Sequence, residues 1–110
     1  MAKAFTYISI NLRPGVEPEE FIKYFNDTFK QFGAKIGLKG SIGLSDRGDK
    51  KGKLAVLWEI ESVESRNRYI PEINVVSEEG LKLLGPAFAE DKGWSNLVES
   101  NEATDYIVQD

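Results

Sequence analysis

The strongest constraint on the fold is a change in hydrophobic period near the amino terminus. From Ala4 to Leu12 the chain reads AFTYISINL, and side chains at alternate positions share one face, as in a half-buried β-strand. After the break at Arg13-Pro14-Gly15, phenylalanines recur at positions 21, 25, 29 and 32, which is the spacing of one face of an α-helix. The sequence therefore predicts a strand and then a helix over residues 16–33, whose aromatic stripe packs against the isoleucine face of the strand.

Two more strands are expected after this helix. Lys35–Ser45 carries apolar residues at even positions with glycines between them, which predicts a bent or bulged strand. Lys53–Ile60 is apolar on both faces, as expected of a central strand or of a strand in an oligomer. The charged segment 46–52 between them contains two glycines and predicts a hairpin connection.

The remainder of the chain predicts a broken helical region and a last strand. Ser62 and Ser77 are candidate helix N-caps, because a serine hydroxyl accepts a hydrogen bond from a free backbone N–H of the first turn. Gly85-Pro86 interrupts the second helical pattern, and Gly93 is expected to end it. Thr104–Gln109, with the sequence TDYIVQ, is the expected last strand.

The resulting order, β-α-β-β-α-β, is the split βαβ pattern of ferredoxin-like α+β folds, with an antiparallel sheet and both helices on one face. We expect residues 1–110 to form a single domain, because 110 residues is an ordinary domain length. Helices on one face leave the other sheet face bare. Aromatic residues occur on both strand faces, including Phe5, Tyr7, Trp58 and Tyr106, so the bare face is expected to favour self-association as a homodimer.

Composition excludes several classes of function. The chain contains no histidine and no cysteine, so it lacks the usual neutral-pH general base, the thiolate nucleophile and the common transition-metal ligands. We therefore expect no metal site and no cofactor. The net charge of −4 gives no reason to expect nucleic-acid binding. No stretch approaches the ~18 apolar residues of a membrane span, and a cytoplasmic protein without a membrane partner is the simplest interpretation.

Short motifs add a family resemblance. The exit from the first strand through Leu12-Arg13-Pro14-Gly15, the passage Trp58-Glu59-Ile60-Glu61-Ser62 and the order of elements resemble the dimeric α+β barrel superfamily, which includes the antibiotic-biosynthesis monooxygenase-like proteins. In this superfamily two ferredoxin-like sheets pack face to face. The resemblance implies a pocket in each subunit between the sheet and the helical region, often holding an apolar or aromatic small molecule.

The same resemblance implies candidate site residues. Asn11 and Trp58 are similar in placement to site residues of haem-degrading members, but their haem-ligating histidine has no counterpart here, which argues against haem degradation. Cofactor-independent monooxygenases of the family position a reactive phenolic substrate with Asn, Trp, Tyr or Arg. This implies Asn11, Arg66 and Tyr69 as catalytic candidates and Tyr7 and Trp58 as substrate-binding candidates, with Asn11 or Arg66 stabilising oxyanion charge.

Structural alternatives exist for these residues. Trp58 in an apolar strand is also expected of a core or dimer-interface residue, and Asn11 of a residue that hydrogen-bonds a neighbouring loop. Arg66 and Arg68 are also expected on a solvated helix face with Glu64. Two hypotheses therefore stand. One is a homodimer that binds an apolar or aromatic small molecule, with Tyr7, Asn11 and Trp58 lining one cavity and with cofactor-independent monooxygenase chemistry. The other is a non-catalytic ligand-binding or protein-interaction module.

Overall fold

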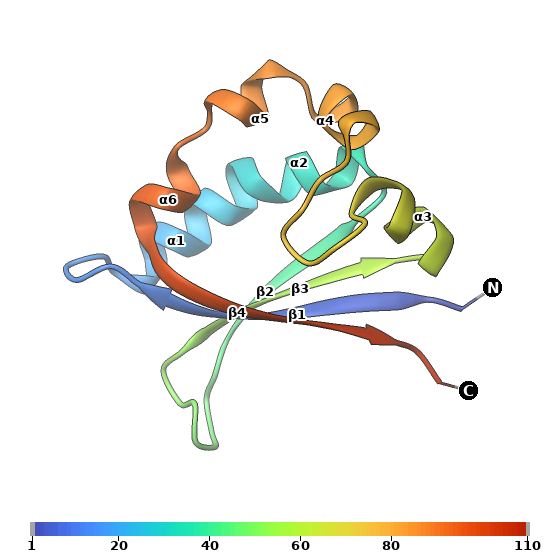
Figure 1. Ribbon diagram of the computed structural model, residues 1–110. Helices are drawn as coiled ribbons and strands as arrows, with labels where there is room; N and C mark the ends of the chain where they lie inside the picture. Colours follow the sequence, from blue (N-terminus) through green and yellow to red (C-terminus); the bar gives the residue numbers. More distant parts are fainter. Residues whose placement is uncertain (1, 110) are drawn as a thin grey trace.

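The computed structural model describes residues 2–109, in which helices cover one face of a four-stranded antiparallel sheet (Figure 1). The strands are β1 (Ala4–Leu12), β2 (Lys39–Leu44), β3 (Leu54–Ile60) and β4 (Val98–Ile107), and their order across the sheet is β2-β3-β1-β4. β3 lies between β2 and β1, which confirms the central strand expected from its two apolar faces.

Two helical segments lie above the sheet. The first runs through α1 (Pro18–Tyr24), the π-helical turn η1 (Phe25–Phe29) and α2 (Lys30–Lys35). The second comprises α3 (Val63–Tyr69), α4 (Glu78–Leu84), α5 (Pro86–Glu90) and α6 (Gly93–Leu97). With the second segment counted as one unit, the order is the predicted βαββαβ, and the helices lie on one side of the sheet as expected (Figure 1).

The aromatic stripe of the first helical segment forms the centre of the core, as predicted. Phe21 and Phe25 are completely buried, and Phe29 and Phe32 continue the contact toward α5. Residues four apart overshoot an α-helical turn of about 3.6 residues, so a stripe at steps of four drifts around the helix. The wider π turn over Phe25–Phe29 offsets this drift and keeps the stripe facing the sheet.

Trp58 of β3 joins the two layers. Its indole ring lies 5.3 Å from the ring of Phe25 and 6.2 Å from that of Phe29, measured between centroids. It fits there because Gly33 of α2 and Gly40 of β2 lack side chains, and a Cβ atom on either glycine would overlap the indole. Two structural alternatives were considered for Trp58, a core residue and a dimer-interface residue. The first is confirmed, since the ring is buried under the helices.

Side chains of the sheet divide between its two faces. Thr6 pairs with Trp58 and Ile8 with Val56 across β1 and β3, and these residues face the helices. Tyr7 therefore faces the other side of the sheet, because successive strand residues alternate. We call that uncovered side the open face.

Both predicted serine caps are confirmed. The hydroxyl oxygen of Ser62 accepts a hydrogen bond from the backbone N–H of Ser65 at 3.1 Å. The hydroxyl oxygen of Ser77 accepts one from the backbone N–H of Gly80, also at 3.1 Å. Each cap satisfies a donor that the first helical turn leaves free, so the starts of α3 and α4 are determined by local sequence.

Some predicted boundaries are wrong. The first helical segment continues to Lys35, so β2 begins at Lys39. Its register with β3 is uninterrupted, so of the two expected irregularities, a bend or a bulge, the bulge is absent. Gly93 begins α6 instead of ending the helical region. β4 begins at Val98 instead of Thr104, because pairing with β1 holds a polar stretch in the sheet that has no strand pattern of its own.

The fit around Trp58 leads to a stability prediction. A Cβ atom on Gly40 would lie 2.6 Å from Cζ3 of Trp58 and 3.0 Å from Cζ of Phe25, whereas one on Gly43 of the same strand would meet nothing within 4 Å. We expect Gly40→Ala to lower the free energy of unfolding by about 1–3 kcal/mol through overpacking. Gly43→Ala is the matched control, expected to be neutral or to stabilise the strand by about 0.5 kcal/mol. Urea unfolding measures both, and equal effects would contradict the described packing.

Candidate functional site

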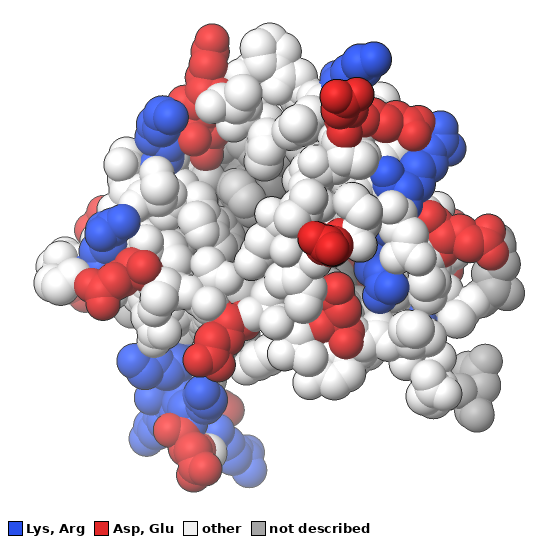
Figure 2. Space-filling view, in the orientation of Figure 1, with Lys and Arg blue, Asp and Glu red and all other residues white. Residues whose placement is uncertain are grey.

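A cavity of about 650 Å³ lies between the sheet and the helical layer. Its floor includes Thr6, Ile8, Trp58, Ile60, Ala103 and Asp105 of the sheet. Its roof includes Phe29, Phe32, Leu84, Phe88 and Trp94, together with the connection between α3 and α4 at residues 70 and 73–76. Figure 2 shows a hollow at this place in the surface, surrounded mostly by uncharged residues. The cavity is therefore mainly apolar and aromatic.

Three charged residues line this cavity among residues 2–109: Arg66, Asp91 and Asp105. The hydroxyl of Thr6 donates a hydrogen bond of 2.5 Å to Oδ1 of Asp105, across the β1–β4 pair. The hydroxyl of Tyr24 donates one of 2.5 Å to Oδ2 of Asp91, which follows α5. Each carboxylate is half-buried and held in place by one protein hydroxyl.

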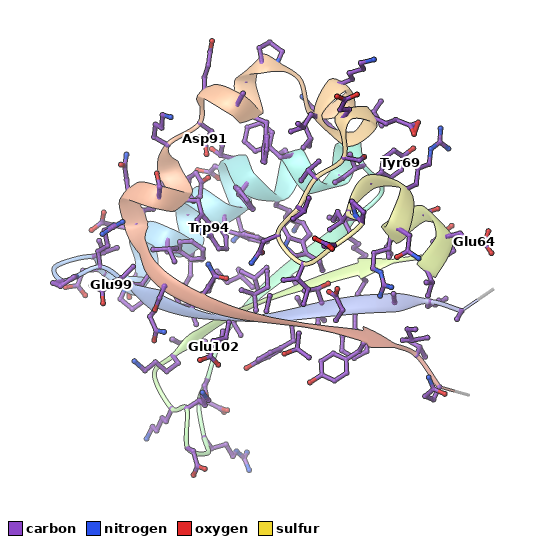
Figure 3. All side chains as sticks on the ribbon, in the orientation of Figure 1. Glu64, Tyr69, Asp91, Trp94, Glu99 and Glu102 are labelled. Carbon is purple, nitrogen blue, oxygen red and sulfur yellow. The ribbon has the colours of Figure 1, made fainter. Side chains whose placement is uncertain are left out.

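Tyr24 connects the first helix to the end of the second helical segment. Burial raises the pKa of its phenol well above the ordinary value, and the hydrogen bond to the Asp91 carboxylate raises this pKa further. Its ring also packs on Gly93, where a Cβ atom would overlap it. Tyr24 is therefore a protonated donor at neutral pH that orients Asp91, and Figure 3 shows Asp91 and Trp94 at this end of the helical layer.

The five sequence-predicted residues do not form one site. Trp58 and Arg66 line the cavity, whereas Tyr7 and Asn11 lie on the open face, on the opposite side of the sheet. The predicted common cavity of Tyr7, Asn11 and Trp58 is therefore wrong, because Tyr7 and Asn11 occupy odd positions of β1 and Trp58 pairs with the even position Thr6. Tyr7 borders a smaller cavity of about 230 Å³ instead.

Two candidates are engaged in local contacts. Asn11 donates a hydrogen bond of 3.0 Å from Nδ2 to Oγ of Ser100, its register partner on β4, and so contacts a strand instead of the expected loop. Tyr69 packs against the buried cluster of Phe32, Ile36 and Leu84 and does not line the cavity. These contacts account for Asn11 and Tyr69 structurally.

Arg68 lies on an exposed helix face with Glu64, as the structural alternative expected. It also pairs with Glu79 of α4, through Nε at 2.7 Å and Nη2 at 2.5 Å from the carboxylate oxygens. Arg66 donates from Nε and Nη2 to Oδ1 of its neighbour Asn67, at 3.3 and 3.1 Å. Arg68 therefore ties α3 to α4, while Arg66 stays at the cavity.

Sequence reasoning missed the polar residues of the cavity. Thr6 shares a face of β1 with Ile8, so the alternation placed it correctly, but nothing in the sequence marked it as a site residue. Asp105 lies in the predicted last strand, but its pairing with Thr6 depends on the register of β1 and β4, which no local pattern specifies. Asp91 lies in the region expected to be a broken helix, and Trp94 lies just after the expected end of that region at Gly93.

The fold can be compared with known proteins once this geometry is established. No protein-family model matches the chain, and no curated protein matches it either. Several solved structures match it over nearly its whole length. The chain has a ferredoxin-like fold.

Three of these structures illustrate the likeness. A DABB-family protein with a ferredoxin-like fold from Mesorhizobium loti has a TM-score of 0.64 and 15% identity, over 100% of both chains. A NIPSNAP-family protein of unknown function from Agrobacterium tumefaciens has a TM-score of 0.65 and 14% identity, over 96% of this chain and 87% of its own. A dimeric ferredoxin-like protein of unknown function from Bacteroides fragilis has a TM-score of 0.54 and 20% identity, over 96% of each chain.

The structural likeness establishes the fold. The monooxygenase-like branch of the predicted superfamily receives no support from the three names, although the fold prediction is confirmed. Within residues 2–109, no three His, Cys, Asp or Glu side chains are grouped so as to hold a metal ion. In the same part of the chain, no helix has the length and apolar character needed to span a membrane.

The Tyr24–Asp91 hydrogen bond predicts a pH-dependent stability. Because the pKa of folded Tyr24 lies above its ordinary value of 10.0, the folded chain keeps a proton that the unfolded chain loses above that pH. The contribution of Tyr24 is therefore fully present below about pH 10 and is lost as the pH rises further. We expect the free energy of unfolding of the wild type, measured with urea, to fall more steeply above about pH 10 than that of Tyr24→Phe.

At neutral pH, Tyr24→Phe is expected to be less stable than the wild type by about 1 kcal/mol, because the hydrogen bond to Asp91 is lost. All other ionisable groups are present in both proteins, so their contributions cancel in the difference. A difference between the two proteins that stays constant from about pH 8 to pH 11 would contradict the assignment.

Proposed function

We propose that this protein is a homodimer that binds an apolar or aromatic small molecule in the cavity of each subunit. The observation that carries this proposal is the cavity itself. Its volume of about 650 Å³ falls within the range of about 300–1,000 Å³ that is typical of small-molecule sites. Its walls are mainly apolar and aromatic, with a few fixed polar groups, and this combination favours an apolar ligand oriented by a small number of hydrogen bonds.

The open face supports the homodimer. Tyr7 is 41% exposed and Tyr106 is 45% exposed, and the ring of Tyr106 stacks on that of Phe5 at 4.8 Å between centroids. Leu57 lies beside Tyr7 in the register of β1 and β3. A second copy packed on this face removes the apolar patch from water. The dimeric state of the Bacteroides fragilis neighbour agrees with this arrangement.

Ligand binding is better supported than oxygenase chemistry. A cofactor-independent monooxygenase needs groups around its substrate that stabilise oxyanion charge. Of the catalytic candidates only Arg66 lines the cavity, while Asn11 lies across the sheet and Tyr69 packs elsewhere. Oxygen consumption by the metal-free protein with a reduced phenolic substrate, abolished in Arg66→Ala, would establish the oxygenase in place of simple binding.

Filling the cavity tests the binding site. Ala103 of β4 lines the cavity, whereas Ala87 of α5 is exposed and does not line it. We expect Ala103→Phe to weaken binding of the neutral fluorescent probe N-phenyl-1-naphthylamine by roughly tenfold, because the larger ring occupies ligand volume. Ala87→Phe is the matched control, expected to leave the affinity unchanged. Undiminished probe fluorescence with a folded Ala103→Phe protein would place binding elsewhere.

A charge on the open face tests the dimer. We expect Tyr7→Glu to convert a dimer to a monomer, because two carboxylates would face each other at an apolar interface. Leu83→Glu on α4 is the control, since Leu83 is similarly exposed at 47% but lies in the helical layer. Sedimentation equilibrium gives the molecular mass of each. A wild-type protein that is monomeric at micromolar concentration would refute the homodimer. That result would not affect the proposal that the cavity binds a ligand.

A further inference from the structure

The cavity has an unequal charge distribution on its walls. Among the described residues it is lined by two carboxylates, Asp91 and Asp105, and by one cationic side chain, Arg66. The ion pairs found within residues 2–109 are Lys23–Asp27 and Arg68–Glu79, so neither cavity carboxylate is in one. The cavity walls therefore carry an excess of negative charge in mainly apolar surroundings.

Asp105 is placed to accept a hydrogen bond from a ligand. It is half-buried on β4, and the Thr6 hydroxyl holds its Oδ1 atom at 2.5 Å. An ionised carboxylate accepts up to about four hydrogen bonds, so Asp105 keeps most of its accepting capacity after this one. Because Thr6 and Asp105 stand on adjacent paired strands, the carboxylate is held by the rigid part of the fold.

Asp91 repeats this arrangement on the opposite wall. It comes from the helical layer, after α5, where Tyr24 holds its Oδ2 atom, and the residue borders the cavity. Figure 3 shows it in the helical layer, farther from the sheet than Trp94. The floor and the roof of the cavity thus each present one oriented acceptor group.

Arg66 compensates these charges only in part. Its guanidinium directs both Nε and Nη2 to the amide oxygen of Asn67, the next residue on α3. It forms no ion pair with either carboxylate. An anionic ligand entering the cavity would lose its hydration close to two negative groups, and repulsion is stronger in apolar surroundings than in water. A ligand with an N–H or O–H group would gain hydrogen bonds to the same carboxylates.

We propose that Asp91 and Asp105 determine the ligand class of this cavity, favouring an apolar molecule with a protonated amine or hydroxyl group over an apolar carboxylate. This inference rests on the proposed ligand-binding function and adds the chemistry of the ligand's polar group. Charge-assisted hydrogen bonds favour the amine most strongly, the neutral hydroxyl less, and the carboxylate least.

Three probes with one hydrocarbon chain test this order: decylamine, decan-1-ol and decanoate, each below its micelle-forming concentration at neutral pH. The protein supplies its own reporter, because both of its tryptophans, Trp58 and Trp94, line the cavity. We expect the tryptophan fluorescence to report the tightest binding for decylamine and at least tenfold weaker binding for decanoate. Repeating the titrations at high salt separates cavity binding from general attraction to a protein of net charge −4.

Charge-neutralising variants locate the effect. Asp105→Asn is expected to weaken decylamine binding at least fivefold and to strengthen decanoate binding, and Asp91→Asn is expected to act in the same direction. Asp49→Asn changes the net charge equally but lies exposed in the β2–β3 hairpin, so its affinities should match the wild type. Circular dichroism checks that each variant is folded, and Asp91→Asn serves if Asp105→Asn does not fold.

The outcomes separate this inference from the proposed function. Decanoate binding as tight as that of decylamine, or equal decylamine affinities in the wild type and in a folded variant of either aspartate, would overturn the inference and leave ligand binding intact. The same holds if N-phenyl-1-naphthylamine binds and decylamine does not. If neither the three decyl probes nor N-phenyl-1-naphthylamine binds, the proposed function is overturned as well.

Discussion

The insertion of Trp58 between the helical layer and the sheet is the contact on which the rest of the structure depends. Its ring requires the absence of side chains at Gly33 and Gly40 and contacts Phe25 and Phe29 of the first helical segment. Because interiors are closely packed, this fit fixes how near the helices approach the sheet. The space left between the two layers beyond the indole is the cavity, so one side chain serves both the core and the site wall.

The two faces of the sheet support different proposed roles because strand side chains alternate. On the helical face, apolar residues form the core and then the cavity, with Thr6 and Asp105 as its polar floor. On the open face, the same strands present Tyr7 and Tyr106 to solvent, a patch suited to a second copy of the chain. Substitutions on the helical face should therefore alter ligand binding, and substitutions on the open face should alter dimer assembly. Each kind should have little effect on the other property.

Local signals in the sequence predicted most of the elements. The phenylalanine stripe and the Ser62 and Ser77 caps were recognisable because each acts within one or two helical turns. β4 was recognised only at its end, because residues 99–102 are polar and become a strand only through pairing with β1. Gly93 was predicted to end a helix but begins α6. In the sequence, a glycine that follows one helix cannot be told from a glycine that begins the next helix.

The sequence by itself determined the order of the elements, the alternation within each strand and the lack of histidine and cysteine chemistry, since these depend on residue type and on neighbours a few positions apart. Only the tertiary structure decided which residues of neighbouring strands lie on the same face of the sheet. Antiparallel register set Trp58 beside Thr6 and not Tyr7, which separated the predicted site residues, and packing of α5 and α6 brought Asp91 over the same cavity as Asp105. Register and layer packing join residues up to about a hundred positions apart, and no local pattern encodes those distances.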